Sequence, residues 1–498
     1  MSYSSRRSAL LTDLYELTMA QGYWVTGRAD VEAVFQLFFR AEPFGGGFAL
    51  TAGLEAALDY LEGLRFLSDD LAYLETLRGS DDAPIFRRDF LDQLAAFRPT
   101  LDVDAVPEGS VVFAHEPLLR VTGGILGAQL VETALLNLVN FATLVATKAA
   151  RVVRAAEGKP VIEFGLRRAQ GPDGGLTASR AAYVGGVQAT SNVEAGRRYG
   201  IPLRGTHAHS WVLSFDSELE AFRAYADAQP NNVVFLVDTY DTMTGVEHAI
   251  EVGHSLRERG FEMDGIRLDS GDLAYLSKRS RERLDAAGFP NARIVASNDL
   301  DEETIESLND QDAAIDAWGV GTRLVTGDGQ SALGGVYKLS AIRDDGGAWR
   351  HVIKVSEQPA KTTIPGVLGV RRYFDERGIA AGDAIHDELT EPAQPMLIID
   401  PTTPYRRKVL SSAWTQEDLL VPVMRAGRRL APSPSLDEIR ARATASLARF
   451  DPAILRRVNP HAYPAGIESA LHARRERLIQ EALAEQHATG QTERHIRG

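Results

Sequence analysis

The sequence predicts an α/β fold whose middle third carries parallel strands joined by crossover helices. Between about residues 160 and 325, short β-like runs alternate with helix-patterned segments, an order typical of parallel sheets. The runs cover 161–164, 202–209, 232–238, 265–272, 292–299 and 314–322. Two intervening segments, 245–260 and 273–288, have a helical pattern and end in glycine, a common helix stop. Six such units are too few for a regular eight-stranded barrel.

Polar and glycine residues cluster where each predicted strand ends. These clusters are Glu163 to Arg168, His207 to Ser210, Asp238 to Asp241, Asp269 to Asp272, Asn298-Asp299 and Gly319 to Thr322. In barrels and in open parallel sheets alike, the carboxyl ends of the strands form the active face. The clusters favour a barrel-like fold, but periodicity alone leaves an open doubly wound sheet as the alternative.

The flanking segments differ from this middle region. A helix is expected from Thr12 to about Trp24, with Thr12 as its N-cap, and further helices near 53–64 and 87–97. A β-rich stretch follows at 103–123, and after about residue 340 come short strands, a linker at 431–436 and a helical tail. We therefore expect an N-terminal α+β domain (1–125), a catalytic α/β domain (126–345) and a C-terminal extension (346–498).

Composition narrows the class of protein. A net charge of −14 argues against a nucleic-acid binder, and the absence of cysteine excludes disulfides and thiolate metal sites. The N-terminus lacks the sustained apolar core of a signal peptide. The most apolar long stretch, Ile125 to Thr147, is interrupted by Gln129 and Glu132, so a buried helix is expected there and no membrane span. We expect a cytoplasmic protein.

Two of the strand-end clusters are suited to phosphate. In the glycine-rich turn 318–327, backbone N–H groups could cradle a phosphate. Arg267 and Asp269 alternate along a strand and therefore share one face, where the arginine could grip phosphate and the aspartate could accept ribose hydroxyls or help hold Mg²⁺. A plain turn and a structural ion pair are the alternative interpretations.

The H-x-H motif at His207 and His209 admits three interpretations. On a strand both imidazoles would face the same side. They could form a metal-binding pair, one of them could accept a phosphoryl group, or both could be buried, hydrogen-bonded histidines. Later strand ends offer Asp238, Asp269 and Asn298 but no histidine, which weighs against a barrel metal-dependent hydrolase.

The cluster after the first run combines an aromatic ring with two cations. Phe164 could stack on a flat ring, and Arg167 and Arg168 could pair with a carboxylate or phosphate.

Together these segments resemble the nicotinate phosphoribosyltransferase family. The matching stretches are TDLYELTMAQGYW (12–24), EFGLRRAQGPDGG (163–175), GTHAHS (205–210), VDTYDT (237–242), IRLDSGD (266–272), ASNDLDE (296–302) and WGVGTRLVTG (318–327), with a weaker fit at KTTIPGV (361–367). The resemblance covers about residues 10–370. It implies an irregular, incomplete α/β barrel with an N-terminal domain, in a homodimer with shared active sites.

The resemblance also implies substrates and residue roles. The substrates would be nicotinate and phosphoribosyl pyrophosphate, with Mg²⁺ as cofactor and ATP as co-substrate. His209 would be phosphorylated beside Asp238, while Arg267, Asp269 and Gly271 would bind phosphoribosyl pyrophosphate. The remaining substrate-binding residues would be Phe164 and Arg167 at the pyridine, Gly319, Gly321 and Thr322 at phosphate, and Tyr15 reaching the pyridine from the partner subunit.

One position bears on the choice between nicotinate and nicotinamide. The similar nicotinamide enzymes place an aspartate in the segment 186–196, where this sequence has Ser191. A hydroxyl can donate to a carboxylate, whereas an aspartate would repel it, so the sequence favours nicotinate. The alternatives are a nicotinamide phosphoribosyltransferase, a metal-dependent hydrolase and a non-catalytic nucleotide-sensing relative.

Overall fold

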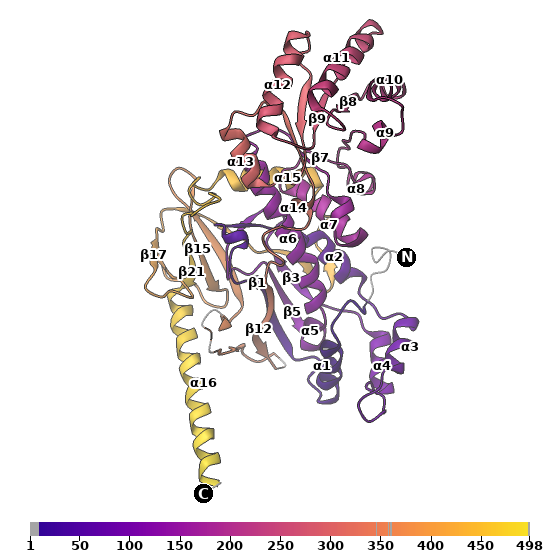
Figure 1. Cartoon of the computed structure of the whole chain (residues 1–498). Coiled ribbons are helices and arrows are strands. Elements are labelled where there is room, and N and C mark those ends of the chain that lie inside the picture. Colours follow the sequence, from indigo (N-terminus) through magenta and orange to yellow (C-terminus); the bar gives the residue numbers. More distant parts are fainter. Residues whose placement is uncertain (1–8, 345, 357, 359–360, 497–498) are drawn as a thin grey trace. The chain divides into compact units, whose positions relative to one another are not determined.

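The computed structural model describes residues 9–344, 346–356, 358 and 361–496, with side chains described as far as residue 484. The chain forms two compact units, and Figure 1 labels many of their helices and strands. Unit 1 comprises Met1–Leu144 together with Ala332–Gly498, and unit 2 comprises Val145–Ser331. These units cut across the three-segment division drawn from the sequence, whose boundaries remain a prediction.

Unit 2 is built on a six-stranded parallel sheet, the incomplete α/β barrel expected from the sequence. The strand order is β7-β6-β11-β10-β9-β8, and every pairing is parallel. The strands are β6 (Val161–Glu163), β7 (Ala189–Thr190), β8 (Val234–Leu236), β9 (Gly265–Leu268), β10 (Arg293–Ala296) and β11 (Ala317–Val320). The helices are α7 (Gly171–Val184), α8 (Val193–Tyr199), α9 (His209–Leu213), α10 (Glu218–Ala228), α11 (Thr242–Glu258), α12 (Leu273–Ala286), α13 (Glu302–Asp310) and α14 (Thr322–Val325), with the 3₁₀ turn η3 (Leu166–Arg168).

The expected strand at 202–209 is wrong. Only Leu203 makes an isolated bridge, to Thr190, and residues 204–208 form a loop before α9 begins at His209. Pro202 has no N–H to donate to a ladder, and Gly205 has no side chain to pack, so this segment gains little from sheet pairing. The sixth strand is instead β7, which lies outside all of the β-like runs identified in the sequence.

Several carboxylates at the strand ends are helix caps. Asp241 accepts a hydrogen bond from the Thr244 N–H (2.8 Å) and caps α11. Asp272 accepts from the Tyr275 N–H (3.0 Å) and caps α12, and Asp301 accepts from the Thr304 N–H and caps α13. Because these side chains satisfy the free N–H groups of helix starts, the polar clusters contain fewer candidate ligand groups than the sequence suggests.

Unit 1 contains two larger sheets and a two-stranded one. The seven-stranded sheet has the order β13-β12-β1-β5-β3-β19-β20, and the six-stranded sheet β17-β16-β21-β15-β14-β18. Strands of the first are β1 (Glu32–Phe39), β3 (Asp102–Ala105), β5 (Leu119–Gly124), β12 (Gly335–Arg343), β13 (Arg350–His351), β19 (Val421–Arg425) and β20 (Arg428–Arg429). Strands of the second are β14 (Leu368–Phe374), β15 (Ala380–Asp387), β16 (Met396–Ile399), β17 (Arg407–Leu410), β18 (Thr415–Asp418) and β21 (Ala465–Glu468); β2 (Ala49–Leu50) pairs with β4 (Val111–Val112).

The helices of unit 1 include those expected near 12–24, 53–64 and 87–97, with one corrected cap. They are α1 (Leu14–Val25), α2 (Leu54–Gly63), α3 (Ser68–Thr76), α4 (Arg88–Ala96), α5 (Ile125–Leu130), α15 (436–448) and α16 (Ser469–Ile496), with the 3₁₀ turn η2 (Pro43–Gly45). Thr12 is not the N-cap of α1. That position is Asp13, and the Thr12 hydroxyl instead donates to Glu16.

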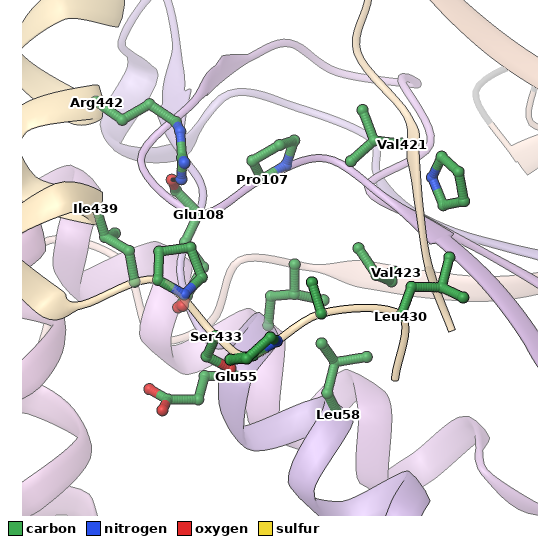
Figure 2. Close-up of a pocket in the computed structure, with 15 residues that line it drawn as sticks. Glu55, Leu58, Pro107, Glu108, Val421, Val423, Leu430, Ser433, Ile439 and Arg442 are labelled. Atoms are coloured by element: carbon green, nitrogen blue, oxygen red, sulfur yellow. Dashed lines mark hydrogen bonds between the residues drawn. The ribbon is translucent and has the colours of Figure 1, made fainter. Parts of the chain in front are cut away.

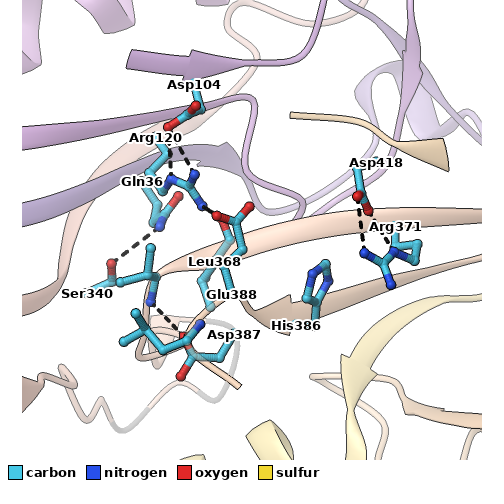
Figure 3. Close-up of polar contacts among 12 residues, drawn as sticks. Gln36, Asp104, Arg120, Ser340, Leu368, Arg371, His386, Asp387, Glu388 and Asp418 are labelled. Atoms are coloured by element: carbon cyan, nitrogen blue, oxygen red, sulfur yellow. Dashed lines mark hydrogen bonds and ion pairs between the residues drawn. The ribbon is translucent and has the colours of Figure 1, made fainter. Parts of the chain in front are cut away.

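A buried polar network joins the N-terminal and C-terminal segments within unit 1 (Figure 3). Arg120 on β5 forms ion pairs with Asp104 on β3 (2.9 Å) and with Glu388 after β15 (2.7 Å), and it donates to the Leu368 carbonyl on β14. Since a buried charge without a partner is costly, this arginine helps to fix the two sheets against each other.

The apolar stretch predicted to be a buried helix forms α5 and then α6 (Glu132–Ala155). By length and composition α6 is the one helix of the described residues that could cross a membrane, but 67% of its apolar window is buried within the protein. That burial is typical of the core helix of a globular protein.

Candidate active site

Arg267, Asp269 and Ser297 form a hydrogen-bonded group at the carboxyl ends of β9 and β10. Arg267 Nη2 lies 2.8 Å from Asp269 Oδ1, and Arg267 Nε donates to Ser297 Oγ (2.7 Å). Ser297 also donates to Asp269. Burial would raise the pKa of Asp269, but the hydrogen bond from Ser297 and the charge of Arg267 hold that pKa below its usual value. The structure therefore brings together a fixed cation and an ionised carboxylate.

His209 faces this group from the first residue of α9. Its Nε2 lies 4.0 Å from Asp238 Oδ1 and 3.9 Å from Asp269 Oδ2, and its Nδ1 lies 3.1 Å from the Thr239 hydroxyl. The side chain is 40% exposed, whereas Asp238 is 1% exposed. His209 is thus open to a ligand while two carboxylates face one edge of its ring.

Asp238 is held by the loop that carries Asp269. Its Oδ2 accepts from the Asp269 N–H (2.7 Å) and from the Ser270 hydroxyl (2.8 Å). Its Oδ1, which faces His209, is buried and has no hydrogen-bond partner among the described residues. At 4.0 Å this oxygen acts on His209 through its charge, and the ring's hydrogen bond goes to Thr239.

His207 does not share a face with His209. Its ring packs edge-on against Tyr225, with centroids 4.8 Å apart, and its Nε2 accepts from the Leu236 N–H (3.1 Å). Burial lowers the pKa of His207 to about 4, so the ring is neutral near pH 7. Because Nε2 is already engaged by the backbone, His207 is a structural histidine, and the metal-pair interpretation of the H-x-H motif is not supported.

Phe164, directly after β6, is seated against Gly319 on β11. A Cβ added to Gly319 would lie 2.6 Å from both Cδ2 and Cε2 of the Phe164 ring. The Arg267 guanidinium carbon lies 5.6 Å from the centre of the same ring. The missing side chain of Gly319 therefore makes room for the aromatic ring, which is a different role from the phosphate contact implied by the resemblance.

Ser191 directly follows β7, in a bend of the chain. Its N–H donates to the Glu163 carbonyl (2.9 Å), and Glu163 immediately precedes Phe164. The buried Glu163 carboxylate accepts from the hydroxyls of Ser179 (2.8 Å) and Thr190 (2.5 Å). Glu163 thus ties the ends of β6 and β7 together and sets Ser191 next to the aromatic residue.

The other predicted site residues are placed as follows. Gly271 adopts a φ of +78° in the turn before α12, a conformation that favours glycine. Gly321 occupies the N-cap position of α14, and Thr322 is that helix's first residue. Arg167 is exposed on η3. Tyr15 belongs to unit 1, on α1, and is 45% exposed.

Sequence reasoning missed two residues around this site, Ser297 and Thr206. Ser297 bridges Arg267 and Asp269, and the Thr206 hydroxyl accepts from Arg267 Nη1 (3.0 Å). Asn298 follows with a φ of 110°, a strained conformation for a residue other than glycine. Ser297 and Thr206 lie within the stretches that matched the family, but nothing in their spacing marks them as contacts of Arg267.

No group of three or more His, Cys, Asp or Glu side chains among the described residues could hold a metal ion by itself.

A separate apolar pocket of about 240 Å³ lies in unit 1, lined by α2, β19, the segment 430–434 and α15 (Figure 2). Glu108 and Arg442 are among its few polar residues, and none of the predicted site residues lines it.

The site places a cation, an ionised carboxylate and an exposed histidine at the carboxyl edge of an incomplete α/β barrel, the edge where enzymes of this fold class have their active sites. Residues 160–389 match the family described as "Nicotinate phosphoribosyltransferase (NAPRTase) family". Residues 10–140 and 369–475 match the N-terminal and C-terminal domains of the same family. The family match therefore extends about a hundred residues beyond the motif resemblance, which ended near residue 370.

Relatives that match this protein over most of its length support the same family. The nicotinate phosphoribosyltransferase of Bacillus subtilis is 41% identical, over 92% of each chain. The human one is 38% identical, over 93% of this chain and 95% of the relative. The crystal structure of human nicotinic acid phosphoribosyltransferase superposes with a TM-score of 0.82 at 35% identity, covering 94% of this chain and 99% of that one. A Pyrococcus furiosus nicotinate-nucleotide pyrophosphorylase, 20% identical over 90% of this chain and 97% of its own, shares the fold with a TM-score of 0.69. The chain belongs to the nicotinate phosphoribosyltransferase family.

Proposed function

We propose that the protein joins nicotinate to phosphoribosyl pyrophosphate and releases nicotinate mononucleotide and pyrophosphate, a step of NAD biosynthesis or salvage. The pyridine nitrogen forms a bond to ribose C1′, and the C1′–O bond breaks as its electron pair leaves with pyrophosphate. The nitrogen has a free lone pair, so no general base is required. The observation that carries this proposal is the Arg267–Ser297–Asp269 group beside an exposed His209 in a member of this family.

The site residues divide between the two substrates. Arg267 would neutralise charge on the phosphoribosyl pyrophosphate, and the ionised Asp269 would accept a hydrogen bond from a ribose hydroxyl. Gly271, Gly321 and Thr322 would present backbone N–H groups to phosphate. With little covalent chemistry to perform, the protein acts by positioning the reactants and stabilising the departing pyrophosphate.

The pyridine would bind between Phe164 and Ser191. A ring seated on Gly319 offers a fixed surface for stacking. The Ser191 hydroxyl makes no hydrogen bond with another described residue, so it can donate to the nicotinate carboxylate, and Arg167 adds positive charge. A nicotinamide phosphoribosyltransferase is the alternative, and an aspartate at position 191 would favour it.

ATP hydrolysis would be coupled through phosphorylation of His209. Nε2 faces two carboxylates, which favour a proton on that nitrogen and repel an anionic phosphoryl group there. Among the described residues, Nδ1 makes a hydrogen-bond contact only with the neutral Thr239 hydroxyl, and it would therefore be the nucleophile. It takes the γ-phosphoryl group, and ADP leaves with the electron pair of the broken P–O bond.

Mg²⁺ would be bound mainly by the phosphates of the substrates. Magnesium sites of this kind use one or two carboxylates and keep several waters, which fits a site where the described residues offer no three-residue cluster. The carboxylates available are those of Asp238 and Asp269. When bound, the ion would neutralise charge developing on the pyrophosphate.

We also propose a cytoplasmic homodimer in which Tyr15 completes the partner's site. Tyr15, Leu14, Met19 and Val25 on α1 are between 37% and 52% exposed. Such an apolar face needs a surface to cover it, and a second copy would supply one.

The proposed reaction is tested by incubating the protein with phosphoribosyl pyrophosphate, Mg²⁺ and either nicotinate or nicotinamide, with and without ATP. Mass spectrometry should detect nicotinate mononucleotide, with a higher yield when ATP is present. Failure to form product from nicotinate in either condition would overturn the proposal, and preference for nicotinamide would overturn the substrate assignment.

A further inference from the structure

Ser297 is a buried hydroxyl placed between two charged side chains. It follows β10 and is 3% exposed, and its backbone N–H donates to the Leu268 carbonyl of β9 (2.8 Å). Its Oγ accepts from Arg267 Nε and donates to Asp269 Oδ1, with the Leu268 carbonyl 3.4 Å away. A hydroxyl has one proton, and the short contact shows that Ser297 donates it to Asp269. The hydrogen bonds therefore run in one direction, from the guanidinium to the hydroxyl and from the hydroxyl to the carboxylate.

This series of hydrogen bonds determines which N–H groups of Arg267 remain available to a ligand. A guanidinium has five N–H donors. Within the described residues three are occupied: Nε by Ser297, one on Nη1 by Thr206 and one on Nη2 by Asp269. One donor therefore remains on each terminal nitrogen, and both are available to a phosphate oxygen.

The same series of hydrogen bonds gives the two carboxylate oxygens of Asp269 different roles. Oδ1 receives both Ser297 and Arg267, whereas Oδ2 makes no hydrogen bond in the described part of the chain and faces His209 at 3.9 Å. The carboxylate thus uses one oxygen to hold the protein together and keeps the other for a ligand. A rotation of either side chain would exchange these roles, and Ser297 opposes that rotation.

We propose that Ser297 is a positioning residue that presents the two terminal nitrogens of Arg267 and Oδ2 of Asp269 to phosphoribosyl pyrophosphate without touching it. The proposal rests on the proposed function and adds a residue that determines binding of the phosphorylated substrate. A purely structural serine would support the β9–β10 connection and affect both substrates alike. The two roles differ in whether the loss falls on one substrate.

The test compares Ser297→Ala with Ser297→Thr and with a matched control. Thr keeps the hydroxyl. Ser280 on α12 is also buried, and its hydroxyl has no hydrogen-bond partner among the described residues, so Ser280→Ala makes the same change without breaking such a chain. Initial rates are measured with each substrate varied in turn, and phosphoribosyl pyrophosphate binding with Mg²⁺ is measured by calorimetry.

We expect Ser297→Ala to lower kcat/KM for phosphoribosyl pyrophosphate by about ten- to a hundredfold, the range for losing a hydrogen bond to a charged group. The KM for nicotinate should change less than about twofold, with Ser297→Thr near wild type and Ser280→Ala unchanged. In an Arg267→Ala background, where phosphoribosyl pyrophosphate binding is measured by calorimetry, Ser297→Ala should weaken binding little further, because the two changes remove one interaction.

Equal losses for both substrates, or full additivity with Arg267→Ala, would overturn the proposal. If Ser297→Ala does not fold, Ser297→Cys, which has similar size and a weaker donor, is measured in the same way. If the wild-type protein forms no product, the proposed function fails, and the calorimetric comparison of wild type with Ser297→Ala still decides the positioning role.

Discussion

Replacing Gly319 by alanine should displace the Phe164 ring. The added Cβ would lie 2.6 Å from two ring carbons, whereas ordinary contact begins near 3.4 Å, so the ring must move by roughly 1 Å. Overpacking of this kind costs about 1–3 kcal/mol of folding free energy. A misplacement of about 1 Å in a site can cost around a hundredfold in rate. We therefore expect kcat/KM for nicotinate to fall between about ten- and a hundredfold.

The assay is steady-state turnover with nicotinate varied, together with denaturant unfolding. Gly174→Ala on α7 is the matched control, because the nearest atom to its added Cβ is Gln170 Cβ at 3.8 Å. It should leave turnover unchanged, and it should not lower stability, since alanine favours a helix over glycine. Adding Phe164→Leu to Gly319→Ala should restore stability but not nicotinate binding, since the smaller side chain removes the clash and the ring together. Wild-type turnover and stability in Gly319→Ala would refute the idea that this glycine seats the ring.

Three further predictions concern selectivity, assembly and pH. Ser191→Asp should lower kcat/KM for nicotinate by about a hundredfold or more, because a like charge faces the carboxylate; equal losses with nicotinamide would show a folding effect instead. Mixing inactive Tyr15→Ala and Arg267→Ala subunits should restore about a quarter of wild-type activity if sites are shared in a two-fold dimer, whereas an active monomer in sedimentation would contradict sharing. The buried, neutral His207 should lower the free energy of unfolding in acid, because the folded protein resists its protonation. Its folded pKa is about 4 against an ordinary 6.5, so its contribution is present above pH 6.5 and is lost as pH falls toward 4. That fall in pKa corresponds to about 3 kcal/mol, and urea unfolding should show a flatter acid limb for His207→Gln.

Hydrophobic periodicity located most of the catalytic unit because its strands are short buried apolar runs. Runs such as 292–299 and 314–322 contain β10 and β11, and their polar ends lie at the carboxyl edge of the sheet. The hydrophobic pattern wrongly predicted a strand at 202–209, where Pro202 and Gly205 oppose sheet pairing. It did not predict β7, which is only two residues long. The family resemblance, and not periodicity, decided in favour of the incomplete barrel.

The roles of individual side chains were less predictable than their positions. Alternation along β9 correctly placed Arg267 and Asp269 on one face. It could not reveal Ser297, because that contact depends on which residue of the neighbouring strand lies opposite, and register is set by three-dimensional pairing. The two histidines were expected to point the same way, but the loop and the start of α9 separate them.

The central claim is that His209 couples ATP to phosphoribosyl transfer, and trapping the phosphoryl group on the enzyme tests it most directly. The protein is mixed with γ-labelled ATP and Mg²⁺, quenched in alkali to preserve phosphohistidine, and digested for peptide mapping. The account predicts label on the peptide that contains His209, its loss when the substrates are added, and no label or ATP hydrolysis in His209→Ala, which should retain slow ATP-independent synthesis. Label on another residue, or ATP hydrolysis at the wild-type rate in His209→Ala, would contradict it.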